Sequence, residues 1–79
     1  MKTSTRSSKI KPAREILALN LRVLRAKKDL SQEVLALQAG INKNYVSQIE
    51  SAQRAVSVDI LDKIATSLQI PVADLLKDE

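Results

Sequence analysis

Four polar side chains with hydrogen-bonding capacity stand close together near the middle of the chain: Lys43, Asn44, Ser47 and Gln48. Two pairs among them are four residues apart, which places all four on one face of a helix. A lysine can donate to guanine, asparagine and glutamine can pair with adenine through two hydrogen bonds, and serine can contact either base. The set favours a surface that reads base edges in DNA, and an ordinary solvated helix face remains the alternative.

The side chains most often used in catalysis are missing, since the chain has no histidine and no cysteine. The usual zinc ligands, acid–base dyads and nucleophile dyads are therefore absent. Two carboxylates, Asp59 and Asp62, lie at an expected helix start, where the helix dipole favours acids. We expect no enzyme activity, no metal and no cofactor.

No stretch of the sequence is apolar over the ~20 residues that a membrane-spanning helix requires. The basic N-terminus lacks the apolar segment of a signal peptide, and the lack of cysteine suits a reducing compartment. We expect a cytoplasmic protein without a membrane partner.

The net charge of +4 is unevenly distributed along the chain. Residues 1–11 contain four basic side chains and no acid, whereas residues 59–79 contain five acids and two lysines. A basic N-terminal half and an acidic C-terminal end suit a protein that meets phosphates on one side. We predict that residues 1–11 form a flexible basic arm, which is simply disordered or, as a further hypothesis, follows the DNA.

The elements that must position the four polar side chains are predicted to be helices. Pro12 opens a helix over residues 12–27, in which leucines recur at helical spacing. Ser31 caps a second helix, which ends at Gly40, and Asn42 caps the helix that carries the four polar side chains. Two short helices joined by a tight turn form the local pattern of a helix-turn-helix, here about residues 31–51.

Two further helices complete the predicted domain. Ser57 caps the first, which carries an apolar stripe up to Leu68, and Pro71 opens a short last helix. No segment alternates with the period of a strand. We therefore predict an all-α fold of five helices over residues 12–79.

Several segments in order resemble the Xre/Cro family of helix-turn-helix regulators, which includes phage repressors and the controller proteins of restriction-modification systems. They are Leu-Ser-Gln-Glu-Val-Leu-Ala at 30–36, Ala-Gly-Ile at 39–41 and Tyr-Val-Ser-Gln-Ile-Glu at 45–50. The resemblance covers about residues 17–76 and implies a lambda-repressor-like fold.

The resemblance also implies roles for single residues. Base contacts fall on Lys43, Asn44, Ser47 and Gln48. Gln32 contacts the DNA backbone and braces the helix that reads the bases, with capping of its own helix as the alternative. Glu50 pairs with Arg25 in a structural ion pair. The other residues expected at the DNA backbone or the minor groove are Tyr45, Arg54, Lys28 and Ser51, of which Tyr45 also suits half-buried packing.

The chain departs from the family at three loop positions. Asp29 and Ala52 stand where the family often has glycine, and Val56 stands where it often has proline. Because alanine is strained in a left-handed conformation, we expect the loop around Ala52 to take another path.

The apolar C-terminal end predicts a two-fold dimer. The expected interface consists of Leu68, Ile70, Val72, Leu75 and Leu76. A dimer sets two reading helices one DNA turn apart, ~34 Å, on a near-palindromic operator. The expected partners are double-stranded DNA, a second copy of the chain and, for an activator, RNA polymerase.

These observations predict a sequence-specific regulator of transcription that acts as repressor or activator, in the manner of an autoregulatory controller. An antitoxin-type regulator is a related alternative. The alternative of a different class is a helical protein-interaction module that does not bind DNA.

Overall fold

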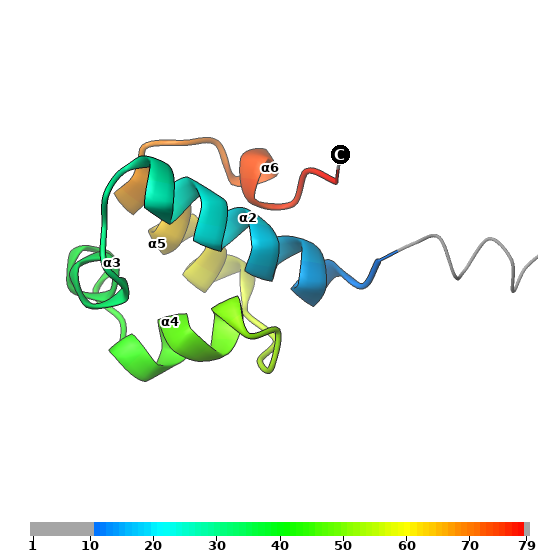
Figure 1. Ribbon diagram of the computed structural model, residues 1–79, viewed down its shortest axis with the longest axis horizontal. Helices are drawn as coiled ribbons and strands as arrows, with labels where there is room; N and C mark the ends of the chain where they lie inside the picture. Colours follow the sequence, from blue (N-terminus) through cyan, green and yellow to red (C-terminus); the bar gives the residue numbers. More distant parts are fainter. Residues whose placement is uncertain (1–10, 79) are drawn as a thin grey trace, which may run out of the picture.

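The computed structural model describes residues 11–78, and this part of the chain forms five helices and no strand. Figure 1 labels them α2 to α6. Their bounds are Ala13–Lys27 for α2, Gln32–Ala39 for α3, Lys43–Glu50 for α4, Val58–Leu68 for α5 and Val72–Leu75 for α6. The predicted all-α, five-helix fold is therefore confirmed for the described residues.

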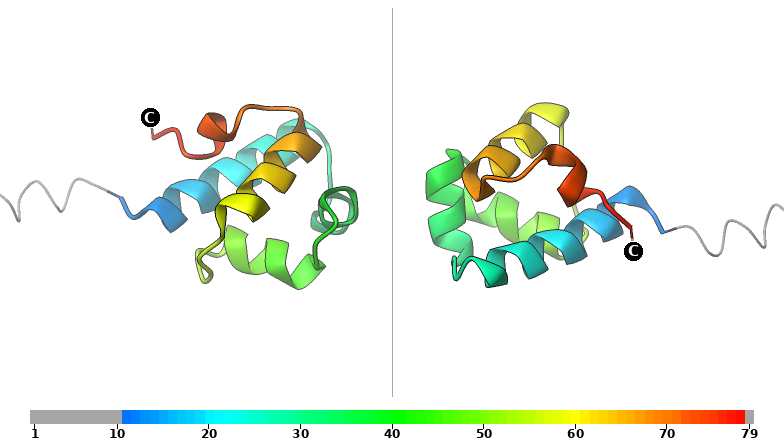
Figure 2. Two further views of the ribbon diagram at one scale, coloured as in Figure 1. Left: turned by 180° about the vertical axis from the view of Figure 1, so that it is seen from behind. Right: turned by 90° about the horizontal axis from the view of Figure 1, so that it is seen from above.

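The helices surround one apolar core. The longest helix, α2, runs along the molecule, with α4 on one side of it and α6 on the other (Figure 1). Figure 2 shows from behind that α5 crosses the molecule between the levels of α4 and α6, and that α3 covers one end. The consecutive helices α3 and α4 form the predicted helix-turn-helix, and α4 turns its outer side away from the rest of the domain.

Three helices begin where a short polar side chain was predicted to cap them. The side chains of Ser31, Asn42 and Ser57 each accept a hydrogen bond from a backbone N–H of the first turn that follows. The two prolines differ slightly from the prediction. Pro12 and Pro71 directly precede α2 and α6 instead of forming their first residue. The first turns are therefore fixed by local chemistry that the sequence displays.

The four helices α2 to α5 end in the same way. A residue with positive φ follows each helix, and the next backbone N–H donates to a carbonyl five residues before it. These residues are Asp29, Gly40, Ala52 and Gln69, with φ values of 59°, 73°, 61° and 60°. The expectation that the loop around Ala52 avoids the left-handed conformation was wrong. The Gln53 N–H donates to the carbonyl of Gln48, and this hydrogen bond closes the turn around Ala52.

The core corrects part of the predicted dimer interface. Leu68 and Leu75 both have exposed fractions of 0% and pack with buried side chains of α2, α3 and α4. They cannot reach a second chain because the domain itself covers them completely. The other three predicted interface residues, Ile70, Val72 and Leu76, keep part of their surface accessible. An interface at this end of the molecule would therefore contain fewer apolar side chains than predicted.

Candidate nucleic-acid interface

Helix α4 has one buried face and one exposed polar face. Val46 and Ile49 anchor the buried face in the core. The opposite face carries the four side chains that were predicted to read bases, and all of them are exposed: Lys43, Asn44, Ser47 and Gln48. The structure thus brings these four together on one accessible surface, which provides hydrogen-bond donors and acceptors without an acidic group.

The end of α4 is fixed by Glu50, whose exposed fraction is only 4%. The carboxylate accepts hydrogen bonds from Nε and Nη2 of Arg25 on α2, at 2.7 and 3.0 Å. It also accepts one from Nε2 of Gln32 at the start of α3, at 3.0 Å. The predicted ion pair is therefore present and bidentate, and Gln32 has the predicted bracing position. Its contact with the DNA backbone stays a prediction.

Two arginines of α2, Arg25 and Arg22, make the remaining hydrogen bonds of this network. Arg25 donates through Nη1 to the backbone carbonyl of Leu30, at 2.7 Å. The hydrogen bond to Glu50 raises the pKa of Arg25 above its ordinary value, although burial opposes the shift. Because the folded pKa is raised, the charge on Arg25 and its contribution to stability persist until the pH becomes strongly alkaline.

Arg22, an exposed residue of α2, also takes part in this network. In the structure its Nη1 donates to the backbone carbonyl of Glu50, at 2.8 Å. This carbonyl belongs to the last turn of α4, where a positive charge offsets the helix dipole. The signal in the sequence was the spacing of three residues between Arg22 and Arg25, which places both on one side of α2.

A second cluster of side chains lies beside the exposed face of α4. The guanidinium carbon of Arg54 lies 4.3 Å from the centre of the Tyr45 ring. The same guanidinium donates through Nη1 to Oε1 of Gln48, at 3.0 Å. Tyr45 itself is half-buried against the core. The loop after α4 therefore places Arg54 beside the predicted base-reading residues, and a contact with the minor groove stays a prediction.

The remaining predicted contact residues are less closely joined to this face. Ser51 follows α4, and its hydroxyl donates to the carbonyl of Gln48, at 3.2 Å. Lys28 stands apart, exposed in the turn between α2 and α3. The predicted arm lies outside the described residues except for Lys11, which is exposed.

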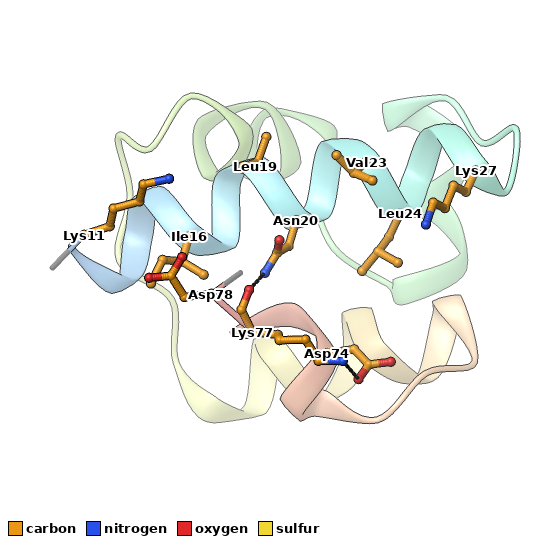
Figure 3. A pocket seen from close by; sticks show the side chains of 10 residues that line it. All are labelled: Lys11, Ile16, Leu19, Asn20, Val23, Leu24, Lys27, Asp74, Lys77 and Asp78. Atoms are coloured by element: carbon orange, nitrogen blue, oxygen red, sulfur yellow. Dashed lines mark hydrogen bonds and ion pairs between the residues drawn. The ribbon is translucent and has the colours of Figure 1, made fainter. Parts of the chain in front are cut away.

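A groove separates α2 from α6 on another side of the domain (Figure 3). The residues that line it include apolar side chains of α2, among them the exposed Leu19 and Val23, together with lysines and aspartates. The side chain of Asn20 donates to the backbone carbonyls of Leu75 and Lys77, each at 2.9 Å. Asn20 therefore ties the C-terminal end of the domain to α2, a role that the sequence pattern did not indicate.

Two kinds of site are absent from the described part of the chain. Among residues 11–78 no three histidine, cysteine or acidic side chains gather in a way that could hold a metal ion. Within the same residues no helix combines the length and apolar character needed to cross a membrane.

Comparison with known proteins identifies the family. The sequence model of the HTH_3 helix-turn-helix family matches residues 21–75, which include α3, α4 and α5. The chain belongs to the HTH_3 family. The expectation that the chain is not an enzyme agrees with this membership, because two relatives are named as a hypothetical transcription factor and a transcriptional repressor.

Several relatives are named as control proteins. The chain is 42% identical to C.MunI of a Mycoplasma species, over 73% of its own length and 80% of that protein. It is 38% identical to C.SmaI of Serratia marcescens, over 80% of its length and 75% of that protein. For two other relatives the match covers a smaller share: 59% of a Neisseria meningitidis protein described as a hypothetical transcription factor, and 63% of C.BamHI of Bacillus amyloliquefaciens.

Solved HTH_3 structures agree with the fold. The controller protein C.AhdI of Aeromonas hydrophila superposes with a TM-score of 0.77 at 40% identity, covering 78% of this chain and 94% of that one. The hypothetical transcription factor NHTF from Neisseria superposes with a TM-score of 0.81 at 35% identity, covering 84% of this chain and 76% of that one. The lambda-repressor-like arrangement implied by the resemblance is therefore the one that this chain adopts.

Proposed function

We propose that the protein is a sequence-specific DNA-binding regulator of transcription that inserts α4 into the major groove. The observation that carries this proposal is the exposed polar face of α4, which is held at its end by a partly buried ion pair. The second helix of a helix-turn-helix contacts base edges with side chains of this kind. The names of the relatives, control protein and transcription factor, support the same role.

The proposal assigns base contacts to Lys43, Asn44, Ser47 and Gln48. Gln32 and Tyr45 flank this face and are assigned to the sugar-phosphate backbone, where they would set the orientation of the domain. The unequal charge distribution suits this arrangement, because the acidic residues of the C-terminal end lie on α5 and α6 or follow α6, and none of them lies on α4. A protein charged in this way approaches the polyanion with one side.

We further propose that two copies bind one near-palindromic operator. The exposed apolar residues around α6 and the groove of Figure 3 provide a surface for a second copy, with both lysines and aspartates among the residues that line the groove. In a two-fold interface the same patch meets itself, so a surface that carries both charges is self-complementary. Activation would also need a contact with RNA polymerase, which stays a prediction from the resemblance alone.

A gel-shift titration on the promoter of the protein's own gene tests the proposal. We expect a discrete complex that competitor DNA of scrambled sequence does not displace, with an affinity that falls as the salt concentration rises. Measurement at two salt concentrations separates the specific complex from general attraction to phosphate. Equal binding to promoter and scrambled DNA, or none to either, would contradict the proposal and favour a protein-interaction module.

A further inference from the structure

Arg54 is held against α4 by two contacts of different kinds. Its guanidinium stacks on the Tyr45 ring, with 4.3 Å between the guanidinium carbon and the ring centre, and it donates to the amide oxygen of Gln48 at 3.0 Å. Stacking on an aromatic face restrains the planar guanidinium without using its N–H groups. We call these three residues the Tyr45–Arg54–Gln48 cluster.

The cluster determines which way the Gln48 amide faces. A guanidinium has only donors, so the group of Gln48 that meets Arg54 must be the carbonyl oxygen. The amide NH2 of the exposed Gln48 makes no hydrogen bond with another described residue. The hydrogen-bonding character of Gln48 is therefore set by Arg54: its donors are free, and its acceptor is engaged beside a positive charge.

This arrangement discriminates between purines. In the major groove adenine presents the acceptor N7 and the N6 donor, so a glutamine needs both its N–H and its oxygen to pair with it. Guanine presents two acceptors, N7 and O6, which the free NH2 of Gln48 can contact. The Gln48 oxygen keeps a second lone pair, but an adenine N6 donor approaching it would also approach the guanidinium charge of Arg54.

We propose that Arg54 is a specificity-determining positioning residue, which turns Gln48 from an adenine reader into a guanine reader. Tyr45 is the platform that keeps Arg54 in place. This inference rests on the proposed function, because it names the base that the same α4 surface selects. It also revises the expectation that Gln48 pairs with adenine.

The test is selection from a pool of DNA with randomised positions, followed by affinity measurement on the selected site. Wild type should enrich guanine at one position, and exchange of that guanine for adenine should weaken binding by about tenfold. The informative variant is Arg54→Met, which keeps a long side chain against the Tyr45 ring and removes every donor. It should prefer adenine or lose the preference at that position, while preferences elsewhere in the site stay unchanged.

Gln48→Ala provides the matched control, because it separates an indirect role of Arg54 from a direct one. If Arg54 acts through Gln48, adding Arg54→Met to Gln48→Ala should not change base preference further. A shift in preference that persists in the Gln48→Ala background would mean that Arg54 itself reads the base, and would overturn the inference. Enrichment of adenine by wild type at the position that depends on Gln48 would also overturn it.

Failure of the inference and failure of the proposed function give different results. If wild type enriches a defined site but Arg54→Met leaves every base preference unchanged, the inference is wrong and the DNA-binding function stands. If wild type enriches no sequence, both the inference and the proposed DNA-binding function are wrong. A measurement on the free protein adds an independent readout: the Tyr45 ring current should shift the NMR signal of the Arg54 side-chain methylene next to the guanidinium, and Tyr45→Leu should abolish that shift.

Discussion

Glu50 is the only charged side chain that is buried among the residues described by the structure, and it lies at the junction of three helices. The carboxylate of Glu50 accepts hydrogen bonds from Arg25 and Gln32, and its backbone carbonyl accepts one from Arg22. A buried ion pair contributes little net stability, but removal of one partner leaves the other without compensation. The chief effect of this network is therefore to fix the orientation of α4.

Glu50→Ala should lower the free energy of unfolding by about 2–4 kcal/mol, because Arg25 and Gln32 would lose their acceptor in a partly buried site. Urea denaturation followed by circular dichroism measures this loss. The control is Glu33→Ala, which removes an exposed acid from the first turn of α3 and should cost less than about 1 kcal/mol. Equal losses for the two variants would show that the network does not stabilise the fold.

Gln48→Ala should change base preference at one position of the selected site and weaken binding to that site by about 1–3 kcal/mol. The variant should fold normally, since Gln48 is exposed. Binding-site selection and gel shifts measure the two effects. Gln38→Ala, an exposed glutamine near the far end of α3, is the matched control and should bind like wild type. Uniform weakening on all DNA sequences by Gln48→Ala would contradict a base-reading role.

At the scale of the helices, the shared way in which α2 to α5 end is the main structural regularity. Each of these helices is followed by a left-handed residue, but Gly40 is the only one of the four that adopts this conformation without strain. After three of them the chain continues with an apolar residue that packs on the core: Leu30, Ile41 and Ile70. After α4 the corresponding residue is the exposed Gln53, so packing does not hold that turn.

Ala52→Gly should therefore raise the free energy of unfolding by about 0.5–1 kcal/mol. It removes the strain of a left-handed alanine, and the gain is reduced by the greater freedom of glycine in the unfolded chain. Thermal or urea unfolding measures the change. The same substitution at Ala26, an exposed position inside α2, should lower stability by about 1 kcal/mol. A loss of stability in Ala52→Gly would contradict the assigned turn.

The helices and their caps could be predicted because their causes are local. Ser31, Gly40 and Asn42 act on backbone groups within a few residues, and apolar spacing shows which side of each helix is buried. The contacts of Arg22 and Arg54 could not be derived in this way, because they depend on how elements pack together and how the loop folds back. The left-handed Ala52 was missed for a related reason: the local preference of alanine opposes it, and the closing hydrogen bond outweighs that preference.

At the scale of the whole molecule, the domain is small and its core is correspondingly limited, so association of two copies would add stability as well as DNA contacts. Leu68 and Leu75 are excluded from the interface because they belong to the core. The accessible apolar surface at this end of the domain includes Leu76, which is 40% exposed.

Leu76→Glu should convert the proposed dimer to a monomer, because it would place a charge from each copy in the proposed apolar interface. Sedimentation velocity at high micromolar concentration measures the change, and gel shifts should show weaker binding to a near-palindromic site. Leu37→Glu is the matched control, since Leu37 on α3 is 80% exposed and lies outside the proposed interface. A monomeric wild type, or a dimer that survives Leu76→Glu, would refute this interface.

The division of α4 into an anchored face and an open face has a consequence for how regulators of this kind diversify. Val46, Ile49 and Glu50 maintain the fold, whereas Lys43, Asn44 and Ser47 have exposed side chains outside the buried network. Those three positions can be exchanged to change the target promoter while the scaffold remains intact. Gln48 is different, because its neighbour Arg54 restricts it. A new regulatory target that depends on position 48 would therefore require paired substitutions in α4 and in the loop that follows it.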